Sequence, residues 1–243
     1  MKIETLCPGN GRKLLLFFNG WAVPASAVAH LEADAETTVA VVSGYTRLEP
    51  LPPAWSAFPE IRLVAWSTGV WAATQLCRGW RFVSATAVNG TPYPCDDRRG
   101  IPDGLFRKTW EQLSPGNLRR FYRRACGPGN YGESWSRHLG ESARENVAGL
   151  CAPPEADGEI PVAALREELR RIGEQAALPS ADADVFPWTR AVLSDADRIF
   201  PFAAMLAYWR ARVCPVVCLH APHYPFYLWK TWNELTDGIV NPA

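Results

Sequence analysis

Ile61-Arg62-Leu63-Val64-Ala65-Trp66-Ser67-Thr68-Gly69 predicts a strand that runs directly into a tight turn. Four of the first five residues are apolar, as expected of a buried strand. Residues 70–76 follow with apolar side chains at helical spacing. A strand, a turn with serine at its tip and a helix are the layout of a nucleophile elbow, usually Gly-x-Ser-x-Gly. Because Ala65 replaces the first glycine, an alternative stays open in which Ser67 only caps the helix.

Composition indicates one globular domain, with room for an insertion. The 243 residues are 48% hydrophobic and 21% charged, which excludes a mainly disordered chain. The formal net charge of +0 gives no global attraction to nucleic acid or to an anionic membrane. Residues 1–11 lack the apolar core of a signal peptide, and the seven cysteines include no Cys-x-x-Cys pair. We therefore expect a cytoplasmic protein with reduced thiols, monomeric, without metal or cofactor.

Apolar runs that alternate with helical stretches predict an α/β fold. We expect a mostly parallel central sheet with helices on both faces. Ligands bind such sheets at the carboxyl ends of the strands, where Asn19-Gly20-Trp21, Ser67 and Asn89-Gly90 fall. The expected strands are 13–18, 37–42, 61–65, 82–88, 188–193 and 215–219.

Residues 94–183 interrupt this alternation and offer no convincing strand. They contain three helical stretches, 102–113, 118–126 and 162–177. We interpret the segment as a helical lid insertion over the strand ends, with residues 1–93 and 184–243 forming the core. The alternative is that these are ordinary crossover helices.

A nucleophilic serine needs a base, and the chain has only four histidines. In hydrolases of this architecture the order is Ser, acid, His, with the base after the last strand. His223, held between two prolines, fits best, and His220 is the alternative. The acid that orients the imidazole should follow the strand 188–193, where Asp197 is preferred and Asp195 is the alternative.

Two backbone N–H groups are candidates for stabilising the oxyanion of acyl transfer. One belongs to Thr68, the residue after the nucleophile, and the other to Trp21 in the loop after the first apolar strand. The alternative for Asn19-Gly20 is a simple turn between a strand and a helix.

Five segments of the chain carry a resemblance to a known family: Leu16 to Trp21, Arg62 to Trp71, Thr86 to Pro102, Asp197 to Pro201 and His223 to Phe226. In matching order, they resemble the BioG-type pimeloyl-acyl carrier protein methyl ester esterases. The resemblance implies an α/β-hydrolase fold with a helical lid. It also implies cleavage of the methyl ester of pimeloyl-acyl carrier protein in the synthesis of the biotin precursor. By resemblance, Ser67 would be the nucleophile, His223 the base and Asp197 the orienting acid.

The implied substrate gives a role to a cluster of arginines at 118–124. Helical spacing puts Arg119 and Arg123 on one face and Arg120 and Arg124 on an adjacent one. Carrier proteins are acidic and their prosthetic arm carries a phosphate, so we expect these arginines, with Trp21, to bind the substrate. The alternative is a solvated helix face. Rival functions are a short-chain carboxylesterase or thioesterase without a carrier protein and, less favoured, a non-enzymatic binding protein.

Overall fold

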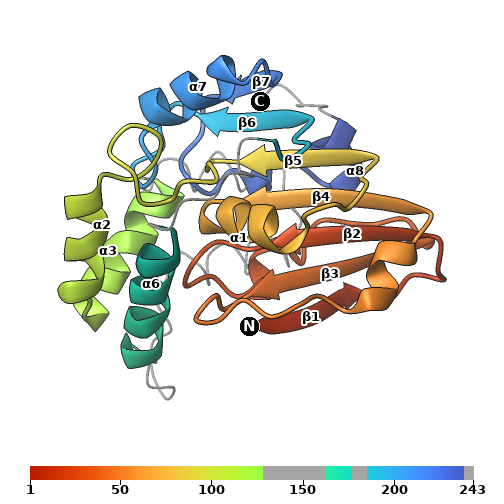
Figure 1. The fold of residues 1–243 in the computed structure, drawn as a ribbon, viewed down its shortest axis with the longest axis horizontal. Helices are drawn as coiled ribbons and strands as arrows, with labels where there is room; N and C mark the ends of the chain where they lie inside the picture. Colours follow the sequence, from red (N-terminus) through yellow and green to blue (C-terminus); the bar gives the residue numbers. More distant parts are fainter. Residues whose placement is uncertain (128–161, 177–184, 238–243) are drawn as a thin grey trace.

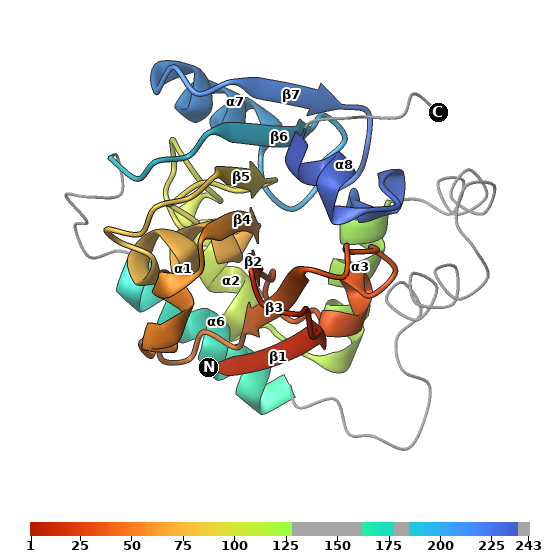
Figure 2. The same ribbon diagram turned by 90° about the vertical axis from the view of Figure 1, so that its right-hand side faces the viewer.

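A seven-stranded sheet forms the centre of the computed structural model, which describes residues 1–127, 162–176 and 185–237. From edge to edge the strand order is β1-β3-β2-β4-β5-β6-β7 (Figure 2). All neighbours are parallel except β1, which pairs antiparallel with β3. The predicted mostly parallel sheet is confirmed. The strands are β1 Lys2–Cys7, β2 Lys13–Phe18, β3 Thr37–Ser43, β4 Glu60–Trp66, β5 Ser84–Val88, β6 Arg190–Ser194 and β7 Val216–Leu219.

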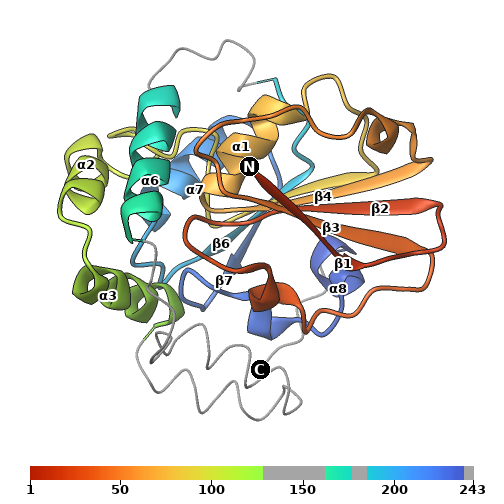
Figure 3. The same ribbon diagram turned by 90° about the horizontal axis from the view of Figure 1, so that it is seen from below.

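Both faces of the sheet are covered, but by different kinds of element. Helices α1 (Thr68–Leu76) and α7 (Phe202–Ala211) pack on one face with Leu14, Leu16 and Phe18. Helix α8 (Trp232–Asp237) and two 3-10 turns, η1 (Ala25–Val28) and η3 (Phe226–Leu228), cover the other face (Figure 3). A third 3-10 turn, η2 (Pro53–Ala57), precedes β4. Successive side chains of β2 point to opposite faces of the sheet, and both faces are buried under these elements. This explains why β2 is a continuous apolar run rather than an alternation of apolar and polar residues.

Three helices stand together beyond the carboxyl ends of the parallel strands (Figure 1). They are α2 (Asp103–Glu111), α3 (Pro115–Cys126) and α6 (Val162–Ala176), close to the predicted ranges. Gly173 lets α6 approach α2 closely, since a Cβ there would lie 2.8 Å from the Trp110 ring. Residues 128–161 and 177–183 of the predicted insertion lie outside the described residues, and the division into core and insertion stays a prediction.

The cysteines depart from the expectation of reduced thiols at one position. Cys126, at the end of α3, is disulfide-bonded. Free thiols are found at Cys7, Cys77, Cys95, Cys214 and Cys218. In the part of the chain that the structure describes, no helix combines the length and apolar character needed to cross a bilayer.

Candidate active site

Ser67 sits at the tip of a strained turn between β4 and α1. Its backbone has φ 57° and ψ −125°, a conformation that costs a non-glycine residue about 1–3 kcal/mol and that clusters at functional sites. Two glycines let neighbouring backbone come close. A Cβ at Gly69 would lie 2.2 Å from the Phe18 carbonyl oxygen, and one at Gly90 would lie 2.4 Å from the Ser67 carbonyl oxygen. The Ser67 turn is therefore packed closely against backbone on two sides, the end of β2 and the segment after β5.

A buried histidine–carboxylate pair lies beside this turn. The Nδ1 of His223 is 2.7 Å from Oδ2 of Asp197, and both side chains are excluded from solvent. The other carboxylate oxygen of Asp197 accepts hydrogen bonds from the backbone N–H groups of Ile199 (2.7 Å) and Phe200 (2.8 Å). The His223 ring lies 5.2 Å from the ring of Trp66, the residue before Ser67. Each polar atom of the carboxylate is thus paired, as a buried charge requires.

The two alternative residues pair with each other instead. His220 Nδ1 lies 3.1 Å from Oδ1 of Asp195, and their side chains are 77% and 46% exposed. Such an open pair is screened by water and holds its imidazole loosely. The geometry therefore favours His223 and Asp197 over His220 and Asp195.

The loop after β2 brings Trp21 close to Ser67. Asn19 shapes the loop: its Oδ1 accepts the Gly20 N–H at 2.9 Å and its Nδ2 donates to the Val23 carbonyl at 2.8 Å. Trp21 Nε1 donates to the Leu165 carbonyl of α6 at 3.0 Å, and its ring lies 5.0 Å from that of Phe121 in α3. The loop that carries this candidate oxyanion donor is thus fastened to two of the helices above the strand ends.

Thr68 is the first residue of α1, and together with Ser67 and Trp21 it lines a cavity. The N–H groups in the first turn of a helix have no acceptor within the helix and point toward its N-terminal end. The Thr68 N–H is therefore available to a negatively charged atom bound at Ser67.

A cavity of about 320 Å³ opens in front of Ser67. Its walls are largely apolar, with Ile101 before α2, Leu105 and Phe106 from α2, Phe121 from α3 and Leu169 from α6. Its charged lining residues are all cationic, namely Lys108, Arg120, Arg124 and Arg198. No carboxylate is among the lining residues of the described chain. The cavity therefore suits an apolar chain that carries or adjoins a negative group.

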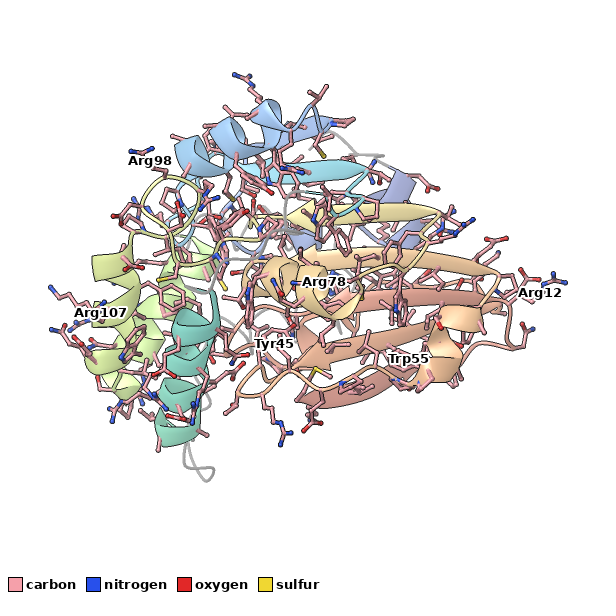
Figure 4. The ribbon with its side chains drawn as sticks, in the orientation of Figure 1. Arg12, Tyr45, Trp55, Arg78, Arg98 and Arg107 are labelled. Carbon is pink, nitrogen blue, oxygen red and sulfur yellow. The ribbon has the colours of Figure 1, made fainter. Side chains whose placement is uncertain are left out.

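The four predicted arginines of α3 fall into two groups. Arg120 and Arg124 line the cavity, whereas Arg119 and Arg123 do not, although all four are exposed. Arg198 was missed by sequence reasoning. The signal in the sequence is its position directly after Asp197, because the loop that follows the strand 188–193 is expected at the carboxyl ends of the strands, where ligands bind. Arg107 points away from the molecule on the outer side of α2 (Figure 4).

Comparison with known proteins adds independent information. The family model described as pimeloyl-ACP methyl esterase BioG matches residues 1–151. The crystal structure of BioG from Haemophilus influenzae is 33% identical, with a TM-score of 0.81 over 98% of this chain and 100% of that one. A malonyl-[acyl-carrier protein] O-methyltransferase of Bacteroides fragilis is 33% identical over 80% of this chain, which spans only 36% of that protein.

More distant structures establish the fold. An esterase from Thermogutta terrifontis has a TM-score of 0.58 at 17% identity, over 98% of this chain and 90% of that one. The α/β-hydrolase fold expected from the sequence is confirmed by this likeness and by the sheet topology. Because the family model covers more than half of the chain, the protein belongs to the pimeloyl-ACP methyl esterase BioG family of α/β-hydrolases.

Proposed function

We propose that this protein is a serine esterase that hydrolyses the methyl ester of pimeloyl-acyl carrier protein, yielding methanol and the free ω-carboxylate for biotin synthesis. The observation that carries the proposal is the buried His223–Asp197 pair next to a serine in a strained turn. The match to the pimeloyl-ACP methyl esterase family supports the choice of the pimeloyl methyl ester as the substrate.

In the proposed reaction, Ser67 Oγ attacks the ester carbonyl carbon while His223 accepts the hydroxyl proton. Asp197 holds the imidazole in its reactive tautomer and stabilises the imidazolium. The N–H groups of Trp21 and Thr68 donate to the oxyanion. When the C–O bond to the methoxy group breaks, His223 protonates the departing oxygen to give methanol. Water, deprotonated by His223, then attacks the acyl carbon. The bond to Ser67 Oγ breaks, His223 returns the proton to that oxygen, and the carboxylate is released.

The carrier protein would dock on the exposed arginines of α3. Arg120 and Arg124 line the cavity and can meet the phosphate of the prosthetic arm, while Arg119 and Arg123 extend the positive surface beside it. Among the described residues none of the four forms an ion pair with a carboxylate. The relative whose name specifies an acyl-carrier-protein substrate supports the same class of partner.

Methanol release from pimeloyl-acyl carrier protein methyl ester tests the reaction. Ser67→Ala should lower the rate by about 10⁴-fold or more, because the nucleophile is lost. Ser56→Ala is a matched control, since Ser56 is exposed in η2 and its hydroxyl donates to the nearby Pro53 carbonyl. Full activity in Ser67→Ala would overturn the mechanism. A wild type that cleaves short esters but not the carrier-bound one would leave a general carboxylesterase.

Paired arginine variants test the carrier. In R120Q/R124Q, kcat/KM for the carrier-bound ester relative to a short neutral ester should fall by about tenfold, because electrostatic steering is lost. R12Q/R78Q removes the same charge from exposed positions away from the cavity (Figure 4) and should keep the wild-type ratio. An unchanged ratio in R120Q/R124Q would reject docking at α3.

A further inference from the structure

Asn89 directly follows the last residue of β5 and lies in the left-handed region of backbone space, with φ 44°. Asparagine tolerates this conformation better than most residues, and its amide offers both donors and an acceptor. The residue is fully buried and its backbone N–H donates to the Val192 carbonyl of β6 at 2.9 Å. It does not line the cavity.

The Asn89 side chain joins the two loops that carry the proposed acid and base. Its Oδ1 accepts the Ser194 N–H at 2.7 Å, and its Nδ2 donates to Ser194 Oγ at 2.8 Å. The same Nδ2 donates to the His223 carbonyl at 2.8 Å. Ser194 is the last residue of β6, three positions before Asp197. One amide group therefore fixes the start of the acid loop against the backbone of His223.

A second buried donor reaches the same carbonyl from the nucleophile's strand. Trp66 Nε1 donates to the His223 carbonyl at 2.9 Å, and Trp66 directly precedes Ser67. Two side chains thus hold the His223 backbone: Trp66 at the end of β4, and Asn89 directly after β5. Ser67 follows the first of these strands and Gly90 the second. A shift of the ring by about 1 Å would cost a reaction of this kind about a hundredfold.

We infer that Asn89 is a positioning residue: with Trp66 it sets the place of His223 relative to Ser67 and Asp197. The inference rests on the proposed serine mechanism. A merely structural role would lower stability without changing the reactivity of Ser67 in folded protein.

The test measures the second-order rate at which a fluorophosphonate probe labels Ser67, together with thermal unfolding of each variant. Labelling needs the base but no carrier substrate, so it reports base positioning separately from substrate choice. Asn89→Asp keeps the Oδ1 acceptor and loses the amide donors. Asn89→Gly keeps the positive φ and removes the side chain altogether, which provides a second route if the first variant folds poorly.

We expect labelling to slow by about 10–100-fold in both Asn89 variants. The slowing should be smaller in Trp66→Phe, because Asn89 still joins Ser194 to the His223 carbonyl there. With a short ester, kcat should fall while KM stays unchanged, because Asn89 lies outside the cavity. Thr86→Val is the matched control. Thr86 is fully buried on the same strand and contacts Arg190 rather than the proposed triad.

Wild-type labelling rates in folded Asn89→Asp and Asn89→Gly would overturn the inference while leaving the proposed function intact. An equal slowing in Thr86→Val would also overturn it, because general loosening would then explain the effect. A wild type that the probe does not label would overturn the proposed function, and this inference with it.

Discussion

Gly90, two residues after β5, lies directly against the nucleophile turn. Because a Cβ there would lie 2.4 Å from the Ser67 carbonyl oxygen, Gly90→Ala must displace the turn. We expect a loss of about 1–3 kcal/mol in the free energy of unfolding, with a parallel loss of esterase activity. Urea unfolding and an ester assay measure the two effects.

Gly104 is the matched control for that substitution. It lies exposed in the first turn of α2, and a Cβ there meets no atom within 4 Å. Gly104→Ala should therefore be neutral or stabilise by up to about 1 kcal/mol through helix propensity. Equal effects at the two glycines would contradict the close-contact explanation.

Two neighbouring glutamates of α6 should respond to pH with opposite sign. Burial raises the pKa of Glu168, whose Oε1 accepts the Tyr45 N–H at 2.8 Å. The folded state then binds the proton more tightly, so this contribution to stability is present below about pH 4.5 and is lost as pH rises through the higher folded value. Tyr45 lies between the sheet and α6 (Figure 4).

Glu167 is exposed, and its hydrogen bonds to Arg170 and Arg171 lower its pKa to about 2. Its contribution is present above about pH 4.5 and is lost as pH falls toward the folded value. Urea unfolding between pH 3 and 7 should show wild type losing stability relative to Glu168→Gln as pH rises, and gaining it relative to Glu167→Gln. The same sign for both variants would contradict the assignment.

At the scale of elements, the strands that could be predicted from the sequence are those with a continuous apolar run, and the strand without such a run was missed. Strands β2 and β4 are buried on both faces and were predicted within two residues. Strand β1 was missed because it lies at the sheet edge, where none of its residues is fully buried, and its Lys-Ile-Glu-Thr-Leu-Cys sequence therefore shows no continuous apolar run. The sequence also predicts a short helix over residues 24–32, with Pro24 in its first turn, but the structure has only the 3-10 turn η1 there.

The candidate site shows the same division. Ser67, Asp197 and His223 could be predicted because each follows a recognisable strand in a fixed order. The hydrogen bonds that Asn89 makes to Ser194 and His223 span more than 100 residues, and no local pattern encodes them. Such contacts become visible only when the strands are placed side by side.

The end of α7 contains a local conflict between sequence and backbone. Val213 has φ 56° although it is β-branched, and it is 90% exposed. Its N–H bonds the Arg210 carbonyl, and the Cys214 N–H bonds the Trp209 carbonyl, which together form the Schellman arrangement that normally uses glycine. Val213→Gly should raise the free energy of unfolding by about 1 kcal/mol without changing activity. Thermal or urea unfolding measures it, and a loss of stability would contradict the prediction.

For the whole molecule, charge distribution matters more than its sum. The formal net charge is +0, yet the charged residues that line the cavity are all cationic. These cations produce a positive electrostatic field at the cavity. In salt solution that field extends over about one Debye length, which shortens as the salt concentration rises. Raising NaCl from 50 to 300 mM should lower kcat/KM for the carrier-bound ester by about tenfold and leave a short neutral ester nearly unaffected. A flat salt response for both substrates would argue against steering.

Asn19 and Asn89 each precede a glycine, and both are fully buried with bonded amides. Asparagine before glycine is the pair in which the next backbone nitrogen most readily attacks the side-chain amide carbon. The attack expels ammonia and closes a succinimide ring, which water then opens to aspartate or isoaspartate. In the native fold both side chains are buried and hydrogen-bonded, which restrains this reaction, so the damage accrues mainly while the chain is unfolded. Each unfolding excursion thus risks a permanent lesion at the residue that joins the acid and base loops. The working lifetime of the enzyme would then be set by how often it opens, and refolding would not restore it.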